Sequence, residues 1–510
     1  MPISPIIKRF EMLRSEQRNW EDLYEEAYQY TMPERGIELG ETDGQNERAE
    51  LYDSTATDSL VNLANRLQDS LVPPFSRWAQ FISGRLIPDE QKDEADDILH
   101  RATIQYFDVL QRTNFKVEIN PALMDIGIGM AGLVINASPK PDIGAVFSSI
   151  PAHQLIVDEG PEGTIDTVFR EHDMAIRNVK ETWEGARFDD TMDRLLREKP
   201  DDKIRLIEGV FPNFSTGLFE YHVFAKKGSF EIFNDKDTTS PWVVPRWSKI
   251  PGRSYGRGPV LFALSDIKSL NVVIQMILEN ASLEVAGMYT AVDDGVLNVD
   301  SIEIAPGITI PVASNGGTVG PSLARLPGGQ GFDLTQISIS ELRQSIRRKL
   351  QDDSLSPLDG TVRSAEEVRL RNREFAKSIG SSFGRLQNEL LGPIITRTLD
   401  LFSKKGLMPE LKVDGDIIDI KYTSPLVQLQ NDADMESLQR SLANMNAFQP
   451  GLAQIAYKTG FLAKFIHAKS GAQPDLIRSA EEIEQLIASA TQSAIENPEG
   501  AQAVQGLIGA

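Results

Sequence analysis

The stretch that decides the fold runs from Ser254 to Ala286 and reads SYGRGPVLFALSDIKSLNVVIQMILENASLEVA. Its apolar residues recur at steps of three and four, and Pro259 stands where the first turn of a helix needs no N–H donor. We therefore predict one helix from Gly258 to Ala286, about 45 Å long at roughly 1.5 Å per residue. Apolar side chains surround this helix, so we expect it to pack against copies of itself or against another long element.

The polarity of this helix bears on where it lies. Polar residues interrupt every window of about twenty residues, the length of a membrane span, and they argue against a membrane. These residues are Asn271, Gln275, Glu279 and Asn280. One small domain cannot cover so much apolar helix. Our candidates for contacts between subunits are therefore the apolar residues Leu270, Ile274 and Ile277.

Composition limits the function. The chain has 510 residues, enough for roughly two to four domains, and no cysteine, which excludes disulfides, thiolate zinc sites and cysteine nucleophiles. Its 52 Lys and Arg against 74 Asp and Glu give a net charge of -22. This charge argues against a protein that grips DNA by its phosphates, but it permits one that surrounds DNA without gripping it. Residues 1–10 hold too short an apolar run for a signal peptide, so we expect a soluble intracellular protein.

The part of the chain before the long helix predicts a mixed α+β fold. Helical periodicity covers residues 6–30, 50–71, 89–113 and 120–130. Short apolar runs of β character follow at residues 133–135, 145–147 and 155–157, and again over residues 206–233.

The chain beyond the long helix alternates between strand and helix. Residues 287–331 predict a small β excursion and residues 332–352 a second helix. The second helix ends in a basic set, Arg343, Arg347, Arg348 and Lys349. Residues 353–362 have the composition of a loop. Capping boxes at residues 364–367 and 479–482 begin two further helices.

Two motifs have the spacing of cofactor or catalytic sites. Residues 127–132 match GxGxxG, but a helix precedes them and a strand follows, the reverse of the dinucleotide fingerprint. Residues 252–256 match GxSxG, but no buried strand leads into Ser254. The histidines are dispersed and the chain has no GxxxxGK[ST] motif, so we expect no metal, no cofactor and no catalytic activity. An enzyme that uses Ser254 or residues 127–132 stays as one alternative.

Several segments together resemble the head-to-tail connector, or portal, proteins of short-tailed bacteriophages. They are YTMP at 30–33, NLANRL at 62–67 with LVPP at 71–74 and Trp78, SYGRG at 254–258, RSAEEV at 363–368, and the helix through Leu390 and Pro393. None of them is an active-site motif, but their order and spacing extend over most of the chain.

The resemblance implies a portal fold assembled as a ring, usually a dodecamer, around a central channel. It assigns residues 1–257 to the wing, 258–286 to the first stem helix, 287–331 to the clip and 332–352 to the second stem helix. It assigns residues 353–362 to the channel loop and residues 363–430 to the helix between wing and crown with the segment after it. Residues 431–510 are assigned to the crown, and whether they also form a C-terminal barrel stays undecided.

The implied function is the passage of double-stranded DNA through one capsid vertex during packaging and ejection. The implied partners are other copies of the chain, DNA, the terminase large subunit as packaging motor, the major capsid and scaffolding proteins, and tail adaptor proteins, with no membrane. The protein would assemble in the host cytoplasm and lie at the portal vertex of the virion. The alternative is another self-assembling capsid or tail component.

Candidate channel residues come from the second stem helix and the loop after it. They are Arg343, Arg347, Arg348, Lys349, Ser354, Ser356, Asp359 and Arg363. In an acidic wall that lets DNA slide, the basic set would supply a local ring of weak phosphate contacts. Salt bridges between neighbouring subunits are the alternative use of the same side chains.

Overall fold

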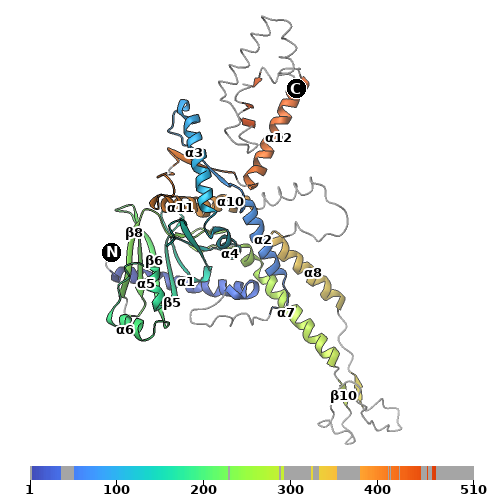
Figure 1. Cartoon of the computed structure of the whole chain (residues 1–510). Coiled ribbons are helices and arrows are strands. Elements are labelled where there is room, and N and C mark those ends of the chain that lie inside the picture. The colour runs from blue at the N-terminus through green and yellow to red at the C-terminus, as the bar shows by residue number, and fades with distance from the viewer. Residues whose placement is uncertain are drawn as a thin grey trace, which may run out of the picture.

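The structure is a computed structural model. It describes residues 3–35, 51–227, 230–286, 289–291, 323–325, 332–352, 379–423 except 412 and 414, 425–448, and short pieces between 456 and 466. Figure 1 shows a body of helices and strands from which α7 and α8 run downward, while α12 (Pro425–Phe448) runs upward. The mixed α+β class predicted from the sequence is confirmed.

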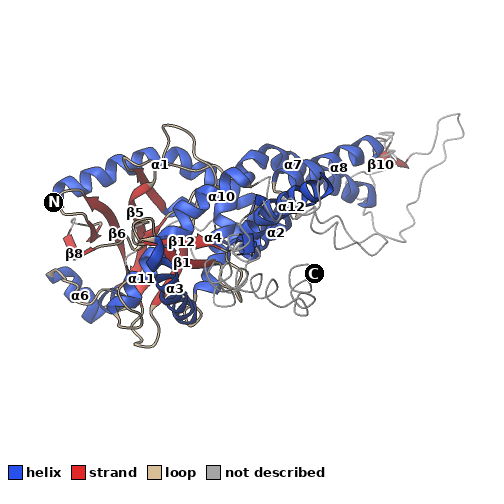
Figure 2. Ribbon diagram, turned by 90° about the horizontal axis from the view of Figure 1, so that it is seen from above, coloured by secondary structure: helices blue, strands red, loops and turns tan. Residues whose placement is uncertain are grey.

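A five-stranded antiparallel sheet forms the outer part of the body. Its order β4-β5-β6-β7-β8 follows the sequence, which confirms the β character predicted at 155–157 and 206–233. The strands are β4 (Leu155–Glu159), β5 (Ile165–Ala175), β6 (Lys203–Asn213), β7 (Leu218–Ala225) and β8 (Phe230–Asp237). Helix α1 (Ile3–Thr31) covers one face, and the short helices α5 (Ile176–Thr182) and α6 (Asp190–Glu198) cover the other (Figure 2).

The inner part of the body is a helical core around two small sheets. One sheet has the order β3-β2-β9, with β2 (Gly132–Ala137), β3 (Ala145–Ile150) and β9 (Trp242–Val243). The other pairs β1 (Ala79–Ser83) with β12 (Ile418–Tyr422). The helices are α2 (Thr55–Leu71), α3 (Asp89–Leu110), α4 (Phe115–Ile128), α10 (Gly380–Leu386) and α11 (Gly392–Lys404), with a π-helical turn at Gln387–Leu391. Single 3-10 turns lie at Pro33–Arg35 and Ala152–Gln154.

Two predicted helices in this core have different bounds from those expected. Helix α2 begins at Thr55 rather than at residue 50, because the Asp53 carboxylate accepts the Thr55 N–H (2.9 Å) and holds the chain before it. Helix α4 begins at Phe115 rather than at Asn120, so Pro121 lies inside it instead of in its first turn. The side chain of Asn114 explains the earlier start, since it bonds both the N–H and the carbonyl of Phe147 on β3.

Two long helices leave the body side by side. Helix α7 spans Pro259–Ala286 and α8 spans Phe332–Lys349, which confirms both predictions closely, and the pair remains together when seen from above (Figure 2). Beyond them β10 (Tyr289–Ala291) pairs antiparallel with β11 (Leu323–Arg325), the described part of the β excursion expected at 287–331.

The first half of α7 is a core helix. Pro259–Ser282 has a mean hydropathy of 1.6, which together with its length is enough for a membrane span, so its polar residues do not exclude one as we expected from the sequence. Packing gives the stronger argument, because Val260, Leu264 and Ile267 lie in the chain's own core among residues of α1, α2, α4 and α8.

Candidate stem and channel surface

The two catalytic-looking motifs cross each other just before α7. The Gly258 N–H donates to the Ile128 carbonyl (2.8 Å), and the Trp247 N–H donates to the Gly129 carbonyl (3.0 Å). A Cβ atom on Gly129 would lie 2.7 Å from the Gly256 carbonyl oxygen, and one on Gly256 would overlap the Gly129 carbonyl oxygen. The glycines of GxGxxG and GxSxG are therefore explained by a close backbone crossing that fixes where α7 begins.

Tyr255 joins this crossing to the edge of the five-stranded sheet. Its hydroxyl accepts a hydrogen bond from the Val157 N–H (3.4 Å) and donates one to the Leu155 carbonyl (3.5 Å). It thus satisfies backbone groups of the edge strand β4 that a neighbouring strand would otherwise bind. Its ring stacks on Trp20 of α1 with the centroids 5.6 Å apart. Burial raises the pKa of Tyr255 above its ordinary value, which keeps the hydroxyl protonated.

A buried arginine ties the same region to the helices behind it. Arg246 is 0% exposed, and its guanidinium donates to Glu389 on the π-helical turn (2.8 Å) and to the Gly163 carbonyl (2.8 Å). It also donates to the Ser254 carbonyl (3.3 Å), which is the only polar contact that the structure records for Ser254 within its described residues. This arrangement makes Ser254 part of a structural turn.

Polar contacts join α7 to α8 and to the body. Asp266 of α7 accepts hydrogen bonds from Ser345 and Lys349 of α8 (both 2.7 Å). Arg343 of α8 pairs with Asp53, which precedes α2 (2.7 Å). Partial burial would raise the pKa of Asp266, but the hydrogen bonds from Lys349 and Ser345 outweigh it and hold the pKa below its ordinary value.

The basic set at the end of α8 thus divides into two pairs. Arg343 and Lys349 form ion pairs within the chain. We had expected these side chains either to contact DNA phosphates or to form salt bridges between subunits. Arg347 and Arg348 lie on the exposed side of the same turn. The other channel candidates, Ser354, Ser356, Asp359 and Arg363, lie outside the described residues.

Three side chains of α2 hold the C-terminal end of α8. Arg66 donates to the Gln351 carbonyl, while Ser59 (2.9 Å) and Asn62 (3.2 Å) donate to the Asp352 carboxylate. Gln351 has a φ of 61°, and the Asp352 N–H returns to the Arg347 carbonyl (2.7 Å), the pattern of a helix-ending motif that usually contains glycine.

Our sequence reasoning missed this contact between α2 and α8. The available signal was the spacing of Ser59, Asn62 and Arg66, which puts three polar groups on one face of an amphipathic helix. The structure thereby fixes the point from which residue 353 continues.

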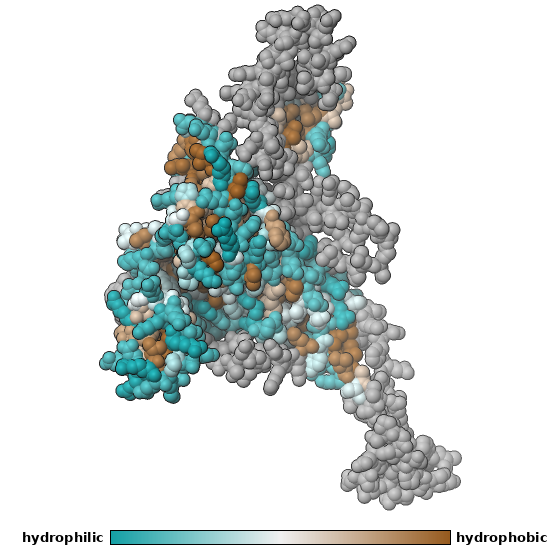
Figure 3. Space-filling model, viewed as in Figure 1, coloured by the Kyte–Doolittle hydropathy of each residue, from teal (hydrophilic) through white to brown (hydrophobic). Residues whose placement is uncertain are grey.

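The residues that α7 exposes are not the ones that we predicted to contact another subunit. Leu270 is 1% exposed in the isolated chain, so its side chain has no surface to offer a neighbour, and that assignment is corrected. Ile274 and Ile277 are half-buried against the same core. A stripe at steps of three and four remains exposed, and we call it the α7 stripe: Phe262, Ser265, Ser269, Val272 and Met276. Figure 3 shows apolar side chains over this helix.

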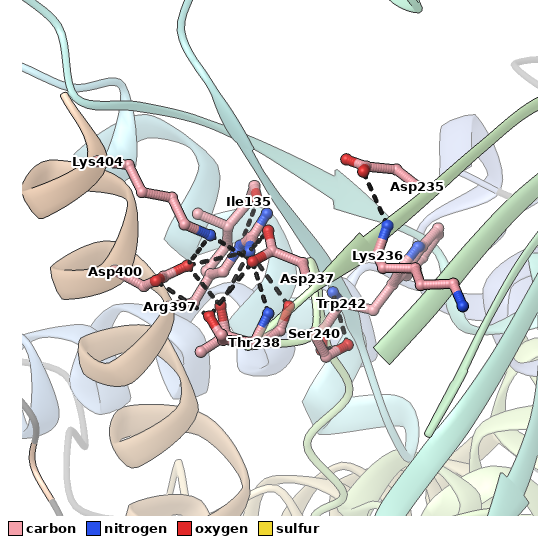
Figure 4. Close-up of polar contacts among 11 residues, drawn as sticks. Ile135, Asp235, Lys236, Asp237, Thr238, Ser240, Trp242, Arg397, Asp400 and Lys404 are labelled. Atoms are coloured by element: carbon pink, nitrogen blue, oxygen red, sulfur yellow. Dashed lines mark hydrogen bonds and ion pairs between the residues drawn. The ribbon is translucent and has the colours of Figure 1, made fainter. Parts of the chain in front are cut away.

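The remaining charged clusters are structural contacts. Arg397 of α11 pairs with Asp237 at the end of β8 (2.6 Å), and Lys404 joins Asp237 and Asp400 in the same cluster (Figure 4). Partial burial would raise the pKa of Asp237, but its bonds to Lys404 and Arg397 lower it to about 2. Within the described part of the chain no group of three or more metal-ligating side chains occurs.

Comparisons with known proteins find a matching family and similar chains. The family model described as bacteriophage head to tail connecting protein matches residues 4–477. The probable portal protein of Bordetella phage BPP-1 is 21% identical over 469 residues (87% of this chain and 82% of the relative), and the portal protein of Escherichia phage T7 is 20% identical over 467 residues (86% and 82%). A chain in the virion of a gene transfer agent particle aligns at 13% identity over 79% of this chain and 91% of that chain, with a TM-score of 0.33.

This protein, with a long pair of helices that leaves a mixed α+β body, is thus a structural component of the virion. The chain belongs to the bacteriophage head to tail connecting protein family, and its place is the portal vertex of the virion. This finding sets aside the alternative of a different capsid or tail component, and it confirms the resemblance found in the sequence.

Proposed function

We propose that copies of this chain close into a dodecameric ring through which double-stranded DNA is packaged and ejected. The single observation that carries the proposal is the α7 stripe, in which three exposed apolar residues, Phe262, Val272 and Met276, stand with two serines at coiled-coil spacing. Exposed apolar residues on a helix that leaves its own body need a neighbour to cover them. A neighbour related by rotation presents a different surface to the stripe, and such contacts form rings when the rotation closes.

Sedimentation velocity of the purified chain at about micromolar concentration and about 0.15 M salt tests assembly. We expect one large species of defined stoichiometry. A monomer under these conditions contradicts the proposal.

In this ring we assign residues 1–257 to the wing, 258–286 and 332–352 to the stem, and 287–331 to the clip. Residues 363–430 connect wing and crown, and residues 431–510 form the crown. The clip would meet the terminase large subunit during packaging and the tail adaptor proteins afterwards. The wing would meet the major capsid and scaffolding proteins. Cross-linking of assembled particles tests each assignment, since each predicts which segment is joined to which partner.

The DNA channel is proposed at the end of α8 and the loop after it. Arg347 and Arg348 are the basic residues exposed there, and residues 353–362 follow the point that α2 holds in place. Arg347→Ala combined with Arg348→Ala should change DNA retention in a salt-dependent way if these side chains meet phosphate. The ring should still assemble, and loss of the ring would instead assign both residues to the subunit contact.

Shortening residues 353–362 by four should leave the ring intact while packaging or retention of DNA falls. The control alters another exposed connection by inserting four residues into the turn at 214–217 between β6 and β7, which lengthens the turn and leaves the paired strands intact. Normal yields of particles that retain full-length DNA would contradict the channel assignment.

We further propose that the chain has no catalytic activity of its own, so that the energy for packaging comes from the motor. The support is the structural use of both glycine motifs and the Ser254 carbonyl contact with Arg246. The purified ring should not hydrolyse ATP, and a serine-reactive phosphonate should leave Ser254 unlabelled. ATP hydrolysis without motor protein, or labelling that Ser254→Ala abolishes, would contradict this proposal.

A further inference from the structure

An exposed basic and aromatic surface lies at the junction of α2, α3 and α4. We call it the Phe75 patch, and it consists of Phe75, Arg77, Arg112, Lys116 and Val117. Phe75 is 89% exposed and Val117 is 70% exposed. Lys116 lines one small cavity together with residues that flank the other four along the chain, among them Pro74, Ser76 and Gln111, so the connection after α2 meets the neighbouring ends of α3 and α4 there. Clustered apolar side chains with this exposure mark an interaction surface.

The patch is rigid before any partner binds. Pro73 and Pro74 restrict the backbone that presents Phe75. The Lys116 ammonium lies 5.0 Å from the centroid of the Phe75 ring, a cation–π contact that orients both side chains. Beneath them Trp78 packs edge-on against Phe107 with the centroids 5.4 Å apart. A preorganised aromatic anchor loses little conformational entropy on binding.

The charge of the patch contrasts with the rest of the chain. Several long cationic side chains elsewhere reach a carboxylate, as Arg343 reaches Asp53 and Arg397 reaches Asp237. For Arg77, Arg112 and Lys116 no ion pair occurs among the described residues. Three unpaired cations on a chain of net charge -22 fit an acidic partner.

We propose that the Phe75 patch binds an acidic surface of the neighbouring copy in the ring, with Phe75 as the apolar anchor and the three cations facing carboxylates. The inference rests on the ring proposed above. A second copy supplies the complementary charge, since each copy carries a net charge of -22. Aromatic residues and arginine are the residue types that dominate the binding energy of protein interfaces. DNA fits less well, because phosphate contacts would leave Phe75 and Val117 in water.

The test measures ring assembly in a dilution series by sedimentation velocity, for the wild type, Phe75→Ser, and Arg77→Glu combined with Arg112→Glu. Each patch variant should raise the concentration for half-assembly at least tenfold, which corresponds to about 1.4 kcal/mol. Raising the salt to about 1 M should weaken the wild-type ring and leave the double arginine variant less affected, because salt screens the exposed charges.

Two matched controls lie away from the patch. Phe214→Ser removes an aromatic side chain that is 75% exposed on the turn between β6 and β7. Arg194→Glu reverses one exposed charge on α6, at the far side of the wing (Figure 1). Both should assemble like the wild type, and thermal unfolding should be alike for all variants because no core contact is removed.

The outcomes separate the inference from the function it rests on. If the wild type forms a ring and the patch variants assemble like the controls, the inference is wrong and the ring stands. If the patch variants assemble normally but their particles lose packaged DNA, the patch serves DNA and the inference is again wrong. If the wild type forms no ring, the proposed function fails and takes the inference with it.

Discussion

The two halves of α7 use similar apolar residues for different partners. Up to Leu270 all of them except Phe262 lie in the chain's own core, among residues of α1, α2, α4 and α8. Beyond it Val272 is 43% exposed and Met276 is 62% exposed. Since the composition of the helix hardly changes between the halves, the difference comes from what lies beside it. The exposed apolar residues of α7 beyond its own body are where we propose that a second copy packs.

Polar contacts mark the boundary between these halves. The Asn271 side chain accepts the Tyr52 N–H (2.8 Å), Asp266 holds Lys349 (2.7 Å), and Lys268 pairs with Glu26 of α1. They fix the rotation of α7 about its axis, because a turn of the helix would break all of them together. The direction in which the α7 stripe faces is therefore set by the single chain.

The largest effect should separate folding from assembly. Leu270→Ala should lower the free energy of unfolding by about 2–5 kcal/mol, because it leaves a cavity in a closed core. Met276→Ala should change it by less than about 0.5 kcal/mol and should instead weaken the ring. Denaturant unfolding below the assembly concentration measures the first quantity, and sedimentation measures the second. Equal effects of both variants on the free energy of unfolding would contradict the difference that we draw between Leu270 and Met276.

The next test concerns a residue between the two halves. Ile274 is half-buried in the single chain, and Ile274→Glu should weaken ring assembly by several kcal/mol if a neighbour completes its burial, because it buries an unpaired charge. Ile274→Leu is the matched control and should assemble normally. A ring of normal stability with glutamate at this position would show that no neighbour covers this part of α7.

The contact between α7 and α8 should depend on pH. The pKa of Asp266 is lowered in the folded chain, so its contribution to stability is present above the unfolded pKa of about 3.9. That contribution is lost as the pH falls through the lower folded value. Asp266→Asn should remove this part of the acid sensitivity while leaving stability at pH 7 about 1 kcal/mol lower. An unchanged acid profile in the variant would show that the contact contributes nothing.

The smallest effect should come from the end of α8. Gln351→Gly should stabilise the chain by up to about 1 kcal/mol, because glycine adopts a positive φ without the steric cost of a Cβ. Gln344→Gly, on the exposed side of the helix, is the matched control and should destabilise by about 1 kcal/mol. Destabilisation by Gln351→Gly, seen in thermal unfolding, would show that the side chain has a role beyond the backbone turn.

Periodicity predicted the helices α7 and α8, but it could not say which neighbour each face meets. The sequence shows apolar residues around the girth of α7, and Leu270 looks the same there as Met276. Only the fold shows that α1, α2 and α4 cover the first and leave the second exposed. The interface assignment of Leu270 was wrong for this reason, while Ile274 and Ile277 stay predictions.

The long-range ion pairs could not be predicted from the sequence either. Arg343 meets Asp53 and Lys349 meets Asp266, partners that lie far away along the chain and have no local motif. The two glycine motifs failed as catalytic motifs on local grounds, because GxGxxG has its helix and strand in the wrong order and no buried strand leads into GxSxG. Their true role, a crossing of Gly129 over Gly256, needs contacts that no spacing rule contains.

One negative-stain image average of the purified wild-type chain, viewed down its symmetry axis, tests the central claim most directly. The exposed α7 stripe predicts a closed ring with a central hole, in which the α7 and α8 helices of neighbouring copies lie against each other. Particles that are single chains, or open filaments without a closed ring, would contradict the account.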